Sequence, residues 1–99
     1  MIYKEIIFMQ KAPEILKSKG LNSNEENFLI ECVINSYSKY YDNFDQMDLD
    51  LEEGLATRYP EKNFVYSLFR DGQGASFGNH NGKFFKLRYK DVIFKIWFQ

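Results

Sequence analysis

Hydrophobic and polar positions follow two different periods along the chain. From residue 63 onward, apolar and polar residues alternate, which predicts four β-strands over residues 63–70, 73–79, 83–89 and 92–98. Three dipeptides interrupt the alternation: Asp71-Gly72, Asn81-Gly82 and Lys90-Asp91. The first two are typical of two-residue hairpin turns. The C-terminal part is therefore predicted to form an antiparallel meander.

The first twenty residues predict one strand and one short helix. The apolar, β-rich run 2–9 is typical of a strand that is partly covered on both faces. Pro13 suits the first turn of a helix and Gly20 suits the position after its end, so we expect a helix over 13–19.

Helical periodicity dominates the middle of the chain. Ser23 and Glu26 have the spacing of a capping box, which predicts a central helix from Ser23 to Asp42. Asp45 resembles a second N-cap, and a further helix is expected over 46–58, although a strand stays open there because aspartate and leucine alternate in Asp48-Leu49-Asp50-Leu51.

These elements predict one α+β domain over 1–99. It consists of an antiparallel meander sheet of four C-terminal strands plus an N-terminal strand, with two or three helices packed on one face.

Composition supports a folded core, because 44% of the residues are hydrophobic and 18% are aromatic. The chain contains no apolar run long enough to span a membrane, and its first residues do not resemble a signal peptide. Cys32 is the single cysteine, so no internal disulfide can form, which fits a reducing cytoplasm. Its apolar neighbours favour inert packing over a reactive thiol.

The net charge of −1 conceals an uneven distribution of charge. The segment 21–57 contains nine acidic residues and one lysine, whereas 58–99 contains eight basic and three acidic residues. Such asymmetry creates local potentials that can steer a charged partner. The alternative is that the acidic and basic blocks face each other within the fold, or are simply solvated, without any partner.

The glycine-rich segment 71–82 contains the only histidine, His80. A phosphate-binding loop needs glycines that lead into a helix N-terminus, whereas these lead from one predicted strand to the next. Hairpin turns and a bulge explain these glycines better than a phosphate-binding loop does. We expect His80 to be a turn residue, because the sequence places no catalytic partner beside it; a chemical role is the alternative.

Six acidic residues and no basic residue occupy the segment 42–53. They do not match an EF-hand loop, and no Cys/His cluster suggests zinc, so no metal or other cofactor is expected. We interpret the acidic segment as a solvated helix face or as a docking surface for a basic partner, formed by Asp45, Asp48, Asp50, Glu52 and Glu53.

Basic and aromatic residues alternate with core positions on the last two strands. If the strands pair, one face presents Phe84, Lys86, Arg88, Lys95 and Trp97. Cations and rings together suit nucleic acid, and they are also enriched at protein–protein interfaces. Coverage of this face by helices, with the lysines at its rim, is the structural alternative.

The predicted β-α-α-β-β-β order, the opening IIFMQKAPEILKSKG and the closing KFFKLRYKDVIFKIWF resemble RelE-type ribosome-dependent RNase toxins over about a third of the chain. The resemblance implies RNA-contacting or catalytic roles for Lys86, Arg88, Arg70 and His80.

Two functional hypotheses follow. The first is a cytoplasmic, non-enzymatic binding protein of bacterial or phage origin, an inhibitor or immunity-type protein that docks on a toxin, nuclease or other enzyme through charge complementarity. It rests on small size, separated charge patches and the lack of an assembled catalytic set. The alternative is a RelE-like small ribonuclease toxin or RNA-binding module that uses the basic, aromatic sheet face.

Overall fold

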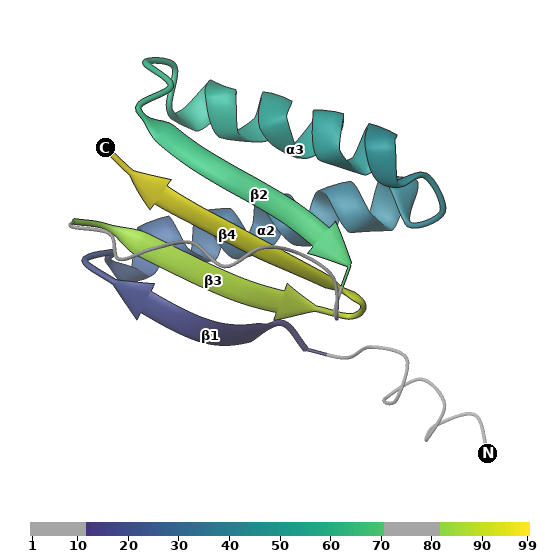
Figure 1. Cartoon of the computed structure of the whole chain (residues 1–99), viewed down its shortest axis with the longest axis horizontal. Helices are drawn as coiled ribbons and strands as arrows, with labels where there is room; N and C mark the ends of the chain where they lie inside the picture. The colour runs from purple at the N-terminus through teal and green to yellow at the C-terminus, as the bar shows by residue number, and fades with distance from the viewer. Residues whose placement is uncertain (1–11, 71–81) are drawn as a thin grey trace.

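The computed structural model describes residues 12–70 and 82–99. Its elements are the strand β1 (Glu14–Lys19), the helices α2 (Ser23–Tyr40) and α3 (Phe44–Arg58), and the strands β2 (Phe64–Arg70), β3 (Phe84–Tyr89) and β4 (Val92–Phe98). The strands form an antiparallel sheet in the order β1-β3-β4-β2, and both helices lie on one face of it (Figure 1). The predicted α+β class and the layering of helices on one sheet face are confirmed.

The order of the described strands departs from a meander at one place. β3 and β4 form a hairpin through Lys90 and Asp91, as expected, but β4 lies between β3 and β2. β4 is thus the central partner of both neighbours, which places the most apolar strand in the middle of the sheet. The predicted strands 2–9 and 73–79 lie outside the described residues.

The expected helix at 13–19 is wrong, because this segment forms the strand β1. β1 pairs antiparallel with β3, from Glu14 opposite Arg88 to Lys19 opposite Phe84, with a bulge between Ile15 and Lys17. A seven-residue helix is marginal without extensive packing, whereas pairing with β3 satisfies the backbone along most of the segment. Gly20 still has a positive φ, 76°, in the turn that leads to α2.

The helix caps lie a little earlier than the sequence predicted. Asn22, not Ser23, caps α2 and forms a reciprocal capping box with Glu25. Asn43, not Asp45, caps α3 by accepting a hydrogen bond from the backbone N–H of Gln46. Asparagine is as good a cap as serine or aspartate, so several candidates competed at both positions.

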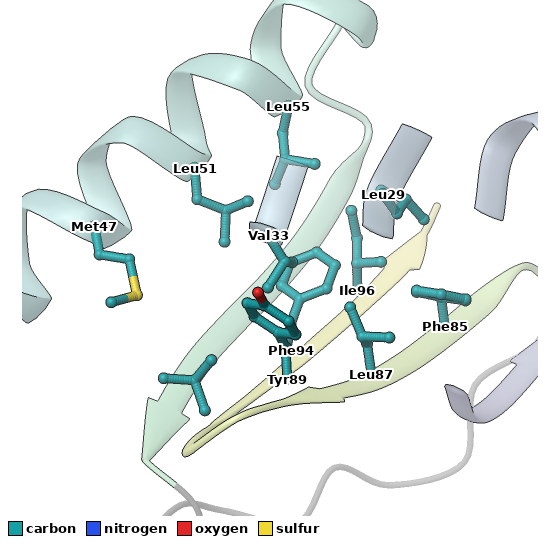
Figure 2. Packing of buried hydrophobic residues seen from close by; sticks show 11 residues of the cluster. Leu29, Val33, Met47, Leu51, Leu55, Phe85, Leu87, Tyr89, Phe94 and Ile96 are labelled. Atoms are coloured by element: carbon teal, nitrogen blue, oxygen red, sulfur yellow. The ribbon is translucent and has the colours of Figure 1, made fainter. Parts of the chain in front are cut away.

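The core lies between the two helices and the sheet (Figure 2). Alternate residues of β3 and β4 point into it, and the helices contribute residues spaced three or four apart, as their periods require. Fully buried side chains include Leu29, Val33, Met47, Leu51, Leu55, Phe85, Leu87, Phe94 and Ile96. Neither described helix is long and apolar enough to cross a membrane.

Candidate functional site

The sheet face opposite the helices gathers the basic and aromatic residues that the sequence singled out. Because antiparallel partners point to the same side of a sheet, the register places Phe84 beside Trp97 and Lys86 beside Lys95. The neighbouring core residues Phe85 and Phe94 point to the other side, toward the helices. The structure therefore brings Phe84, Lys86, Arg88, Lys95 and Trp97 onto one surface.

Strand β1 adds two lysines to this surface. Lys17 lies opposite Lys86, and Lys19 lies opposite Phe84, so both share the face away from the helices. Lys17 also lies over the Phe84 ring, with its ammonium 6.0 Å from the ring centroid. We call the resulting set the basic face; it consists of Lys17, Lys19, Phe84, Lys86, Arg88, Lys95 and Trp97.

The members of the basic face differ in how accessible they are. Lys17 and Lys19 are exposed, whereas Lys95 is buried, with only 8% of its surface exposed to solvent. Burial lowers the pKa of Lys95, and the adjacent Lys86 cation lowers it further. Phe84, Arg88, Lys95 and Trp97 are all engaged in interactions within the protein. Arg88, for example, donates a hydrogen bond to Glu14 at 3.5 Å.

The acidic residues of α3 do not form one surface. Because a helix turns once in about 3.6 residues, Asp45, Asp48 and Glu52 lie on one flank, and Asp50 and Glu53 lie on the flank toward α2. Asp48 accepts a hydrogen bond from the Tyr66 hydroxyl at 2.8 Å. Asp50 accepts one from Ser36 at 2.7 Å and pairs with Lys39 at 3.4 Å. Asp45, Glu52 and Glu53 are exposed.

Asp50 also lines a polar groove of about 290 Å³ between α2 and α3, together with Cys32 and Glu53. Burial, together with the charges of Glu31 and Asp50, raises the pKa of the Cys32 thiol to about 11. The thiol is therefore protonated at neutral pH, which is in keeping with a packing role rather than a nucleophilic one. Within the two described ranges, no cluster of histidine, cysteine or carboxylate side chains could hold a metal ion.

A polar cluster that the sequence did not predict joins α2 to one end of the sheet. Asp91, in the β3–β4 turn, accepts hydrogen bonds from the Tyr37 hydroxyl, at 2.7 Å, and from Arg70. Burial opposes ionisation of Asp91, but these two partners hold the pKa of its carboxyl below the ordinary value. The Arg70 guanidinium also lies over the Phe44 ring, 5.1 Å from its centroid. Arg70, an RNA-contacting candidate under the toxin hypothesis, is thus held at the end of β2.

The Tyr37 hydroxyl is expected to ionise only in strong alkali. Burial and the hydrogen bond to Asp91 raise its pKa to about 12. The neutral phenol is the form favoured by folding, so its contribution to stability is complete below its ordinary pKa, about 10, and is lost as pH rises through about 12. The difference in near-ultraviolet absorbance between wild type and Tyr37→Phe measures this ionisation. Asp91→Asn should lower the midpoint; a midpoint that this substitution leaves unchanged would contradict the assigned cause.

His80 and the glycine-rich segment lie outside the described residues, apart from Gly82. No protein-family model matches the chain, and no curated protein matches it either.

Proposed function

We propose that this chain is a small binding protein that docks on an acidic surface of a partner protein through the basic face. The observation that carries the proposal is the convergence of cations from three strands on the side of the sheet away from the helices. The exposed Lys17 and Lys19 and the half-buried Lys86 supply the charge, and the aromatic residues supply apolar contact area.

The same geometry favours the basic face over the acidic helix as the docking surface. Asp48 and Asp50 already accept hydrogen bonds within the chain, and their carboxylates lie on different flanks of α3. Using them to dock a partner would cost those internal interactions. Lys17 and Lys19 are exposed, and the contact of the Lys17 ammonium with the Phe84 ring is weaker than a hydrogen bond to a carboxylate, so docking through them costs less. A protein that covers an acidic surface in this way acts as inhibitors and immunity proteins do.

A charge-reversal experiment tests this function. Lys17→Glu, Lys19→Glu and Lys86→Glu are combined in one variant, and a matched control combines Lys39→Glu, Arg58→Glu and Lys90→Glu, which changes net charge equally away from the basic face. Each protein is immobilised and exposed to RNase-treated bacterial lysate, and captured proteins are quantified by mass spectrometry. We expect wild type and control to retain an acidic protein whose recovery falls at least about tenfold with the basic-face variant.

Equal recovery by the two triple variants would contradict docking through the basic face.

Single-stranded RNA is the second candidate partner, because Phe84 and Trp97 lie side by side among cations, as in platforms that stack bases. An overall isoelectric point near 5.8 makes a general polyanion binder the weaker hypothesis. Fluorescence anisotropy with a labelled oligouridylate at low salt distinguishes the two: binding that the basic-face variant alone loses would replace the protein partner with RNA. Growth arrest on induction would further favour a toxin.

A further inference from the structure

The outer edge of β2 presents backbone groups that could pair with another strand. β2 pairs with β4 alone and ends the sheet in the described part of the chain. The backbone C=O of Asn63 accepts a hydrogen bond from the N–H of Gln99 at 2.8 Å, so the backbone polar groups of residue 63 point toward β4. Hydrogen-bonding direction alternates along an antiparallel strand. The N–H and C=O groups of Phe64, Tyr66 and Leu68 therefore point away from the sheet.

A groove of about 280 Å³ runs beside this edge, between β2 and α3. Its lining consists of Glu52, Ala56, Lys62, Phe64, Val65 and Tyr66. Two aromatic rings and an alanine make most of it apolar. The hydrogen bond from Tyr66 to Asp48 fixes one ring, so this wall of the groove is already in place before anything binds.

Charge around the groove indicates what it binds. Asp45 and Glu52 are exposed on the flank of α3 that overlooks β2, and Asp48 lies between them, so these three carboxylates outnumber Lys62, the one cation among the lining residues. A second copy of the chain, paired β2 to β2 about a two-fold axis, would bring this acidic flank against itself, which is unfavourable. An extended segment with lysine or arginine two residues from an apolar residue would complement both the charge and the apolar lining, because such residues share one face of a strand.

We propose that the edge of β2 and this groove bind an extended, basic peptide segment of a partner protein. The segment adds to the sheet beside β2, through main-chain hydrogen bonds to Phe64, Tyr66 and Leu68. Alternate side chains of the segment lie on the helix side. One apolar side chain enters the groove, and a cation two residues away, on the same side of the added strand, meets Glu52. This site shares no residue with the basic face, so it stands or fails independently of the proposed function.

Synthetic octapeptides test this site. One peptide repeats Val-Thr-Lys-Thr, so that valine and lysine share one face of the strand, a second has glutamate in place of lysine, and a third carries N-methyl groups on alternate residues of the lysine peptide. Binding is followed by fluorescence anisotropy, and the site is located by backbone amide chemical shifts. We expect only the unmodified lysine peptide to bind, with shifts at Phe64, Tyr66 and Leu68.

Two variants one residue apart provide the matched control. Glu52→Lys reverses the charge beside the groove, whereas Glu53→Lys makes the same change on the α2 flank of the helix. We expect Glu52→Lys to weaken binding at least about tenfold and Glu53→Lys to change it less than about twofold. Equal weakening by both, shifts confined to other strands, or no binding at about 1 mM peptide would overturn the proposal. So would a dimer in sedimentation velocity that Ala56→Arg dissociates, since a second copy would then be the occupant.

Discussion

Leu55→Ala is expected to destabilise the protein by about 2–5 kcal/mol, a large part of the roughly 5–15 kcal/mol available to a domain of this size. Leu55 has no exposed surface and lies in the core cluster where α3 meets α2 and the sheet (Figure 2). Truncation removes apolar contacts and leaves a cavity that the close-packed neighbours fill only in part. Chemical denaturation followed by circular dichroism measures the loss.

Leu49→Ala is the matched control, since it makes the same change in the same helix. Leu49 is 54% exposed, so little apolar surface returns to water, and alanine has a slightly better helix propensity. We expect a change within about 0.5 kcal/mol. Similar losses for the two variants would mean that α3 does not present Leu55 inward, and the packing of the whole helix would need revision.

This pair of leucines also shows why much of the fold could be predicted. Helical and strand periods are local properties of the chain, so they assign most side chains to a buried or an outer face without any knowledge of the tertiary structure. The same alternation placed Lys86 and Lys95 on one surface. The tight Lys90-Asp91 turn sets the register of β3 against β4, and the structure places the two lysines directly opposite each other.

The rest of the candidate site depends on contacts that the local pattern does not contain. Lys17 and Lys19 reach the basic face only because β1 pairs with β3, which lies far along the chain. The segment carries proline and glycine at its ends, which are helix signals as well as strand boundaries. The Tyr37–Asp91–Arg70 cluster likewise joins three elements that are distant in sequence.

Two proline substitutions in β1 are expected to differ in their cost to stability, because the N–H groups of neighbouring residues point to opposite edges of the strand. The backbone of Lys83 accepts a hydrogen bond from Phe98 in β4. The backbone N–H and C=O groups of residues 84 and 86 in β3 therefore point toward β1. Those of their partners Lys19 and Lys17 point toward β3. Lys17→Pro removes a ladder N–H and leaves a β3 carbonyl without its donor, at a cost of about 2–3 kcal/mol. Ser18 directs its N–H away from β3, so Ser18→Pro should cost less, although its hydroxyl also loses the hydrogen bond to Glu26.

Comparison of the two variants by denaturant unfolding decides between a strand and a helix in this segment. A strand makes the cost depend on the parity of the position, because only alternate residues donate to β3. In a helix over 13–19, both prolines would fall in the interior and both would be similarly harmful. Larger destabilisation by Lys17→Pro therefore supports β1, and with it the placement of Lys17 and Lys19 on the basic face. Equal destabilisation would remove these two lysines from that face and with them the main argument for the proposed function.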